Sequence, residues 1–330
     1  MIKLLRSNNP ANYVLMFALM LVFWAFKIIF MPTDIENFES YNLLFKTLPE
    51  TIFFKYLVTI CGFVVVFLFS LLINKTNSEL LIVKSAYQSP GMFFVILSGA
   101  YINSQRLTPI LIASMLLFLS ILILMHCYQK YKAFDNCFNS GLVFSLGVLI
   151  FPKLIFFFPL LVFVLFYIKP VQLRELLVFI MGVFTPTTLY FSALWLYGDL
   201  NSAIIKLETI FSQTFSSGRY SLFFALVLLN PIIWAIITII AKYLYNPSNK
   251  VSTRKFQTII VILVLYFVIL YISSLIENEA IVVLFAPLCF LFSNIVINAG
   301  KNVSLFFLYG LLISIFVSQF FQISFYLSMF

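Results

Sequence analysis

The chain has 330 residues, of which 63% are hydrophobic and only 9% carry a charged side chain, and its formal net charge is +9. Soluble domains contain about 45–50% apolar and about 25% charged residues, so this composition excludes an ordinary soluble protein and indicates a membrane protein. The basic residues stand in the loops between apolar segments and form no separate basic tract, which argues against a nucleic-acid partner.

Cysteine and histidine are too scarce and too scattered for metal chemistry. The four cysteines, Cys61, Cys127, Cys137 and Cys289, lie in or near apolar segments, and the chain has one histidine, His126. Their spacing fits neither a zinc site nor a disulfide framework. The chain also lacks the glycine-rich phosphate loop, the nucleophile elbow and the zinc-protease motif. We therefore expect no metal and no cofactor.

Eleven apolar segments follow one another along the chain. A membrane-spanning helix needs about 20 mostly apolar residues. The segments cover 12–31, 51–74, 90–104, 108–128, 137–151, 154–168, 177–197, 220–245, 257–275, 280–298 and 303–327. Between them we find no internal repeat and no stretch with the composition of a soluble domain. The sequence therefore predicts an all-α, polytopic transmembrane bundle of about eleven spans, forming a single domain over residues 1–330.

Two features of this series need interpretation. The N-terminal stretch MIKLLRSNNP is basic and precedes an apolar run that is longer than a signal peptide and has no small-residue cleavage site. We expect an uncleaved first helix. Near Phe151, Pro152 and Lys153 a proline interrupts the apolar pattern. The region 137–168 is therefore either two spans or one broken, re-entrant element.

The charge distribution predicts the orientation. With the N-terminus in the cytoplasm and alternating spans, the cytoplasmic side receives 13 of the 20 basic residues but three of the 11 acids. This asymmetry agrees with the positive-inside rule. We expect a multi-pass protein of a bacterial inner membrane, with a cytoplasmic N-terminus.

Two predicted outer loops contain helical periodicity. The first loop, 32–50, and the second segment, 199–219, each repeat apolar residues at steps of three and four. The repeating residues are Ile35, Phe38, Tyr41, Leu44, Phe45 and Leu48 in the first and Ile204, Leu207, Ile210 and Phe211 in the second. Both segments are therefore expected to be amphipathic helices that lie in the membrane interface.

The first outer loop also concentrates negative charge. Four of the 11 acids lie between residues 31 and 50, among them Asp34, Glu36 and Glu39. Thr33 and Glu36 match a capping box, and acids in a first helical turn interact favourably with the helix dipole. Capping alone thus explains part of the cluster. The alternative is catalysis, because a carboxylate that is partly desolvated between spans has a raised pKa and acts as a general base.

Basic residues on the predicted outer side form the complementary set. Arg106, Lys153 and Arg219 are candidates for binding the phosphate of a lipid, since arginine offers a bidentate fork and lysine a point charge. The alternative is that these side chains snorkel from helix ends towards water.

Several stretches resemble the polytopic glycosyltransferases called GT-C over roughly residues 1–200. The stretches are MPTDIE, SQRLTPILIASMLLFLS, NSGLVFSLGVLIFPKLIFFFPLLVF and LRELLVFIMGVFTPTTLYF. They also resemble an uncharacterised bacterial inner-membrane family with the same layout. The resemblance implies sugar transfer from a polyprenyl-phosphate donor at the outer face. Asp34 would deprotonate the acceptor with support from Glu36 or Glu39, and Arg106 or Arg219 would hold the donor phosphate.

Two other functions stay open. The chain lacks the Asp-Glu pair and the large soluble outer domain that some relatives of that group carry. A non-catalytic scaffold subunit of an envelope or secretion complex, docking inner-membrane partners through its outer amphipathic helices, is therefore the main alternative. Transport of a lipid or small molecule is the third, although we find no acidic residue in the middle of a span.

Overall fold

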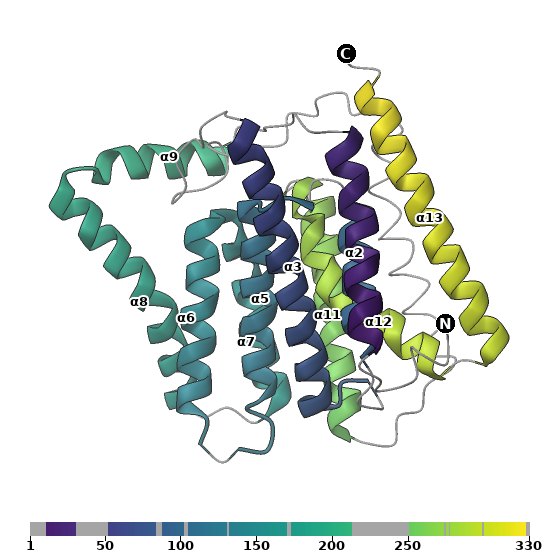
Figure 1. Cartoon of the computed structure of the whole chain (residues 1–330). Coiled ribbons are helices and arrows are strands. Elements are labelled where there is room, and N and C mark those ends of the chain that lie inside the picture. The colour runs from purple at the N-terminus through teal and green to yellow at the C-terminus, as the bar shows by residue number, and fades with distance from the viewer. Residues whose placement is uncertain are drawn as a thin grey trace.

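The computed structural model describes residues 11–30, 52–83, 88–101, 105–130, 132–169, 173–212, 251–273, 275–276, 278–298 and 300–327. Over these ranges the chain is helical, with short turns and no strand, which confirms the all-α prediction (Figure 1). The α-helices are α2 (Ala11–Phe30), α3 (Ile52–Leu80), α4 (Ser89–Ala100), α5 (Pro109–Met125), α6 (Phe134–Ile150), α7 (Phe158–Ile168), α8 (Leu173–Tyr197), α9 (Leu200–Ser212), α11 (Val251–Ile272), α12 (Phe285–Asn298) and α13 (Lys301–Leu327), and the 3-10 helices are η3 (Pro152–Phe157) and η4 (Asn278–Leu284).

Helices occupy ten of the eleven predicted apolar segments, and the segment 220–245 lies outside the described residues. Within the described ranges, four helical stretches are long and apolar enough to cross a membrane: Tyr56–Leu80, Leu173–Tyr197, Val251–Ile272 and Ala280–Asn298. Six further apolar stretches of 10–17 residues lie within the other helices, among them Asn12–Ala25 of α2 and Asn302–Ile315 of α13. The helical nature of these segments is therefore established, while the count of eleven spans stays a prediction.

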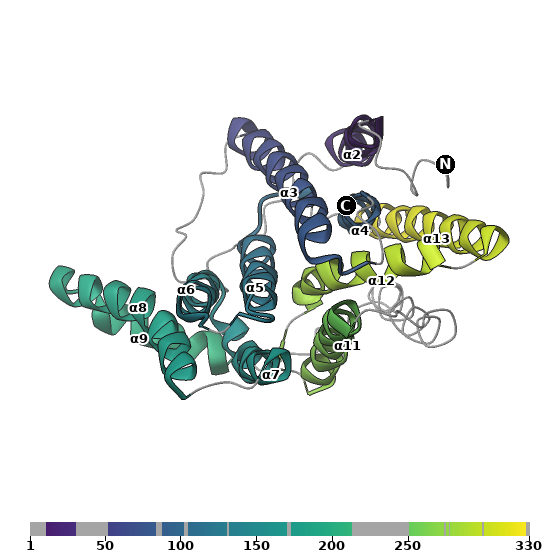
Figure 2. The same ribbon diagram turned by 90° about the horizontal axis from the view of Figure 1, so that it is seen from below.

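The core of the bundle is built around two short helices, α4 and α12. Every residue from Ser89 to Gly99 in α4 and from Phe285 to Val296 in α12 is buried. The hydroxyls of Ser89 and Ser293 share a hydrogen bond, and Phe93 meets Phe292 edge to face with ring centroids 6.0 Å apart. Helices α2, α3 and α13 pack around α4, as the view from below shows (Figure 2). At 12 residues α4 is about 18 Å long, too short to cross a bilayer unaided.

A side chain from α3 caps the start of α4. The N-cap residue Gln88 makes no capping hydrogen bond with its own side chain. Instead, the Asn74 Oδ1 atom accepts a hydrogen bond of 2.7 Å from the Gly91 backbone N–H. Three residues further along α3, the Asn77 Oδ1 atom accepts one of 3.0 Å from the Val83 N–H. The first contact satisfies an N–H group that the buried start of α4 would otherwise leave without a partner, and the second holds the turn after α3.

The region 137–168 contains two antiparallel helices, α6 and α7, joined by η3, and whether each of them spans a membrane stays a prediction. Helix α6 ends at Ile150, and η3 turns the chain so that Leu154 lies against Gly147. Helix α7 then runs in the direction opposite to α6. The hydrogen bonds of Lys169 show this direction, because the residue follows the end of α7 and contacts Glu175 and the Lys130 carbonyl near the start of α6. The interrupting proline thus begins the 3-10 turn at the reversal.

Two glycines allow α6 and α8 to approach closely. A Cβ atom on Gly141 would collide with the Phe179 carbonyl oxygen, and one on Gly182 would collide with the Phe138 carbonyl oxygen. The backbones therefore touch where these helices cross, as in the small-residue contacts of membrane helices.

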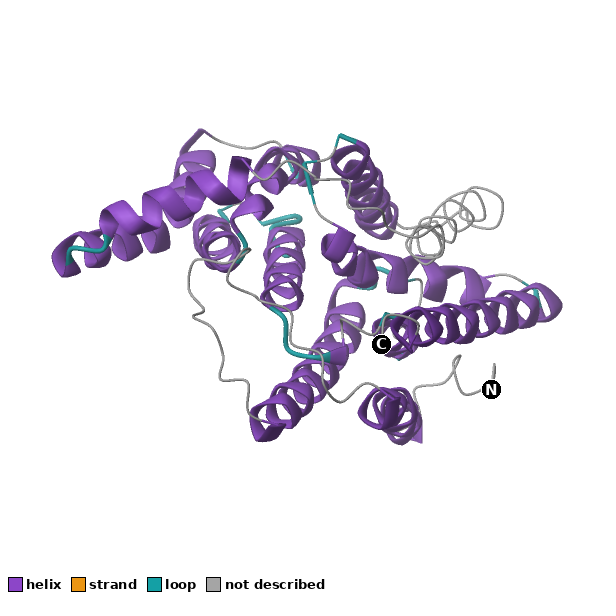
Figure 3. Cartoon of the chain, turned by 90° about the horizontal axis from the view of Figure 1, so that it is seen from above, coloured by secondary structure: helices purple, strands orange, loops and turns teal. Residues whose placement is uncertain are grey.

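Helices α8 and α9 form an arm at one side of the bundle (Figures 1 and 3). Only 11% of the residues in the apolar stretch of α8 are buried. Gly198, with φ +79°, turns the chain into α9, which leads back to the bundle, where Phe211 contacts Phe156 at 6.1 Å between ring centroids. Within the predicted second outer segment, α9 buries Ile210 and leaves Ile204 exposed. Residues 213–219 lie outside the described ranges.

Candidate functional site

The bundle has two ends that differ in their charged residues. We call the end that carries η3 and α9 the upper end and the end that carries the α5–α6 turn, residues 126–133, the lower end, following their places in Figure 1. The upper end corresponds to the predicted outer side and the lower end to the predicted cytoplasmic side.

Arg106 is buried at the upper end, directly before α5. Its residue surface is 4% exposed. The next residue, Leu107, donates its N–H to the Val58 carbonyl oxygen of α3 at 3.2 Å. Thr108 then caps α5 by accepting the Leu111 N–H at 3.1 Å. A Cβ atom on Gly62 would come within 2.7 Å of the Arg106 carbonyl carbon, so this glycine lets α3 lie against the arginine backbone.

A glutamine beside Arg106 adds polar atoms to this end. The Gln105 Nε2 atom donates a hydrogen bond of 2.8 Å to the Gly99 carbonyl oxygen at the end of α4. Gln319 of α13 donates to the same oxygen. The Gln105 Oε1 atom is buried and accepts no hydrogen bond from any described residue. A donor group from a ligand would complete its hydrogen bonding.

Lys153 is the second buried cation of the upper end. It is 6% exposed and follows Pro152 in η3. Helices α5 and α6 are antiparallel neighbours. Helix α5 begins shortly after Arg106 and α6 ends shortly before Lys153, so both residues lie at the same end of these two helices. Burying two cations costs free energy unless anionic or polar groups surround them. Their burial also argues against the alternative that these two side chains snorkel into water.

The remaining residues of the predicted site lie outside the described ranges. Asp34, Glu36 and Glu39 belong to segment 31–51 and Arg219 to segment 213–250, so their roles stay predictions. The structure does fix the two ends of the first of these segments. Helix α2 ends at Phe30 and α3 begins at Ile52, both at the upper end (Figure 1).

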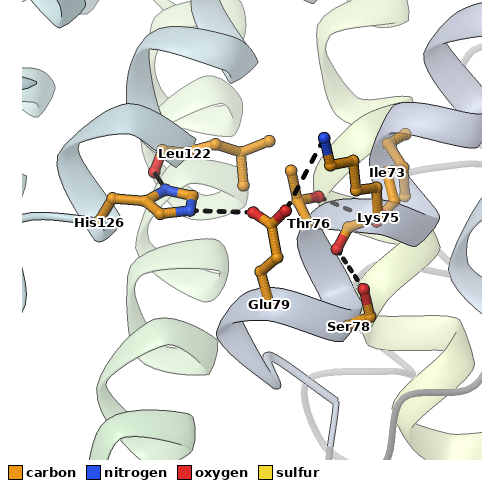
Figure 4. Close-up of polar contacts among 7 residues, drawn as sticks. All are labelled: Ile73, Lys75, Thr76, Ser78, Glu79, Leu122 and His126. Atoms are coloured by element: carbon orange, nitrogen blue, oxygen red, sulfur yellow. Dashed lines mark hydrogen bonds and ion pairs between the residues drawn. The ribbon is translucent and has the colours of Figure 1, made fainter.

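The lower end contains an interhelical contact that the sequence analysis missed (Figure 4). The His126 Nε2 atom lies 3.3 Å from Glu79 Oε2, and its Nδ1 atom lies 2.8 Å from the Leu122 carbonyl oxygen. Both ring nitrogens thus lie within hydrogen-bonding distance of oxygen atoms. Lys75 approaches the same carboxylate at 4.0 Å. His126 and Glu79 are 47 residues apart, and no sequence pattern signals such a pair.

A buried ion pair was also missed. The Lys169 Nζ atom lies 2.6 Å from Glu175 Oε1, and the side chains are 12% and 1% exposed. The same carboxylate oxygen accepts the Ala133 N–H at 3.1 Å. Glu175 therefore joins the start of α8, the end of α7 and the turn before α6. This arrangement fits a structural role, since the Lys169 ammonium and the Ala133 N–H already occupy Oε1.

A cluster of neutral polar side chains lies in the lower half of the core. The Gln257 Nε2 atom donates to the Ile82 carbonyl oxygen at 3.1 Å and to Asn294 Oδ1 at 3.3 Å. Thr253 donates its hydroxyl to the Leu81 carbonyl oxygen at 3.0 Å. These bonds attach the turn after α3 to α11 and α12 and leave the cluster satisfied internally. Among the described residues, no group of three His, Cys, Asp or Glu side chains is placed to hold a metal ion.

Comparison with known proteins gives a family but no function. No curated protein and no solved structure matches the chain significantly. A family model described as a family of unknown function, DUF6427, matches residues 50–327. This range covers most of the chain and includes Arg106, Lys153 and the whole described bundle from α3 onwards. The chain therefore belongs to the DUF6427 family.

Proposed function

We propose that this protein is a membrane glycosyltransferase that takes a sugar from a polyprenyl-phosphate donor at the upper end of the bundle. The observation that carries the proposal is the burial of two cations, Arg106 and Lys153, at the same end of an apolar helical bundle. Both side chains already interact with other groups of the chain, and a lipid-linked phosphate would add negative charge beside the two cations while its apolar tail suits the surrounding helices.

In this proposal the bundle crosses a bacterial inner membrane eleven times, with the N-terminus in the cytoplasm. The direction of the described helices supports this, since α2 and α6 run upwards and α3 and α7 run downwards (Figure 1). The lower end, which carries Lys130, Lys132 and Lys169, then faces the cytoplasm, as the positive-inside rule requires. The upper end faces outwards.

The residues divide the chemistry between them. Arg106 binds the donor phosphate through its planar fork, Lys153 adds a point charge, and Arg219 is a further candidate ligand. Asp34 takes the proton of the acceptor hydroxyl, with Glu36 or Glu39 supporting it. The acceptor oxygen then bonds to the anomeric carbon while the bond to the phosphate oxygen breaks. Arg106 and Lys153 stabilise the charge that develops on the departing polyprenyl phosphate.

The donor-binding step is tested with Arg106→Gln and Lys153→Gln. Each variant removes a charge-assisted contact worth about 1.5–3 kcal/mol, so we expect donor affinity to fall by about tenfold or more. Binding of a polyprenyl-phosphate sugar to the purified protein in detergent is measured by native mass spectrometry. Lys206→Gln, on α9 at the same end, is the matched control and should bind normally. Unchanged affinity in both site variants, with normal thermal stability, contradicts the proposal.

The catalytic step is tested separately with Asp34→Asn. This variant keeps the shape of the side chain and removes the base, so the donor should still bind while sugar transfer falls at least a hundredfold. Transfer is followed by release of polyprenyl phosphate. Normal transfer by Asp34→Asn would remove Asp34 from the mechanism.

One observation favours the scaffold alternative. Helix α8 has 11% of its apolar stretch buried, against 50% for α11 and 94% for the stretch that contains α12. The arm formed by α8 and α9 thus leaves a broad apolar face for contact with a partner helix or with lipid. Copurification after mild detergent extraction separates these outcomes. A stoichiometric partner that is lost when Trp195 and Leu196 are both replaced by Ser, with donor binding intact, would favour the scaffold.

A further inference from the structure

The lower end carries lysines from separate parts of the chain. Lys130 and Lys132 belong to the α5–α6 turn, Lys169 ends α7, and Lys255 lies in the first turn of α11. We call these four residues the lower lysine cluster. Seen from below, the ends of α5, α6, α7 and α11 lie near one another (Figure 2).

Hydrogen bonds hold the two inner lysines in place. The Lys169 Nζ atom donates to the Lys130 carbonyl oxygen at 3.1 Å and contacts Glu175. The Lys255 Nζ atom donates to the Ile168 carbonyl oxygen at 3.3 Å and lies 5.4 Å from the centre of the Tyr128 ring. Because Ile168 and Lys169 are consecutive, these bonds bring α11 and the α5–α6 turn to the same short stretch of backbone.

The cluster keeps a net positive charge. Glu175 balances Lys169, and the other acids near the α5–α6 turn are the exposed Asp135 and Glu79, which lies between His126 and Lys75. Lys130 and Lys132 are exposed. A lysine ammonium has more N–H donors than the single protein hydrogen bond of Lys255 uses. An anion with several oxygens can therefore bind to Lys130, Lys132 and Lys255 without breaking the buried pair.

Apolar side chains beside the cluster indicate what the anion is attached to. Phe163 and Phe166 of α7 are 46% and 52% exposed, and Leu173 and Leu177 of α8 are 75% and 50% exposed. These residues continue from the charged end along the outside of the bundle. A soluble phosphate would leave them bare, whereas the acyl chains of a phospholipid cover them.

We propose that the lower lysine cluster binds the head group of an anionic phospholipid, whose acyl chains lie against α7 and the start of α8. This site is distinct from the upper end and does not depend on the proposed glycosyl transfer. It fits the preference of basic residues at the ends of membrane helices for anionic lipids.

The test compares lipid retention by variants of the full-length protein. Wild type, Lys130→Gln/Lys132→Gln/Lys255→Gln and the control Lys75→Gln are purified and titrated with phosphatidylglycerol or phosphatidylcholine, with bound lipid counted by native mass spectrometry. Lys169 is left intact because Glu175 depends on it. Lys75 is a suitable control because it lies on α3 at the same end, with a side chain 76% exposed.

We expect the triple variant to lose phosphatidylglycerol affinity by on the order of a hundredfold, which is about fivefold per cation. Phosphatidylcholine binding and Tm should be unchanged, Lys75→Gln should bind normally, and Arg106→Gln should bind phosphatidylglycerol normally. Equal losses in the triple variant and in Lys75→Gln would overturn the proposal, because they indicate only a general effect of charge. Displacement of the lipid by millimolar inorganic pyrophosphate alone would also overturn it and assign the site to a soluble phosphate.

Discussion

Glu175 connects three segments through one carboxylate. Its Oε1 atom receives the Lys169 ammonium and the Ala133 N–H, and its side chain is 1% exposed. A carboxylate so deeply buried is stable only while its partners remain, because removing one of them leaves a charge without compensation. The pair therefore stabilises the arrangement of α6, α7 and α8 more strongly than an exposed salt bridge of the same length would.

Lys169→Met should therefore destabilise the protein by roughly 3–5 kcal/mol. The double variant Lys169→Met/Glu175→Gln should recover much of that loss, since the glutamine carbonyl still accepts the Ala133 N–H and carries no charge. Reversible unfolding in mixed detergent measures both values. Exposed Lys132→Met is the matched control. If the single and double variants are equally unstable, the buried charge is not the cause.

At the scale of elements, contact between α6 and α8 depends on the absence of two side chains. Gly141 and Gly182 face backbone carbonyl groups across the crossing, and neither position has room for a Cβ atom. Helix α8 is otherwise largely exposed, so this crossing is its main attachment to the bundle. Hydroxyls of α8, such as Thr188 donating to the Phe184 carbonyl at 2.9 Å, satisfy carbonyl oxygens around Pro186 within the helix.

Gly182→Ala should force α8 away from α6 and cost about 1–3 kcal/mol, as overpacking does elsewhere. We expect a lower Tm and faster protease cleavage near the α8–α9 turn. Gly300→Ala is the matched control, because a Cβ atom there meets nothing within 4 Å. A Tm of Gly182→Ala equal to that of the wild type would show that α6 and α8 can move apart without a loss of stability.

At the scale of the whole molecule, the two ends differ in what they bury. The upper end buries Arg106 and Lys153, whereas the lower end exposes Lys130 and Lys132 and pairs Lys169 with Glu175. An exposed cation at the end of a membrane helix costs little free energy, whereas the two buried cations depend on the groups of the chain with which they interact. This asymmetry favours placing binding at the upper end and lipid anchoring at the lower end.

The orientation itself is tested by cysteine labelling. In intact bacterial spheroplasts, Asn201→Cys on α9 should react with a membrane-impermeant maleimide and Lys132→Cys should not. Inverted membrane vesicles should give the reverse, because these exposed positions lie at opposite ends of the bundle. The wild-type protein serves as the background control for its own free cysteines, three of which are buried. Labelling of both variants from one side contradicts the alternating topology.

The sequence by itself determined the helices and their order. A segment in lipid must satisfy its backbone hydrogen bonds internally, so long apolar runs predict helices wherever they occur. Ten of the eleven predicted segments accordingly coincide with described helices. The same pattern identified Arg106 and Lys153 as cations at helix ends, because each follows or precedes an apolar run.

Only the tertiary structure decided which helices and which charges are buried. Lipid chains are as apolar as a protein core, so hydrophobicity does not separate the buried α12 from the exposed α8. Proline at residue 152 was compatible with a continuous or a reversed chain direction, and the contacts of Lys169 show that the chain reverses there. The pairs His126–Glu79 and Lys169–Glu175 join different segments, and local sequence carries no record of such contacts, since their geometry comes from helix packing.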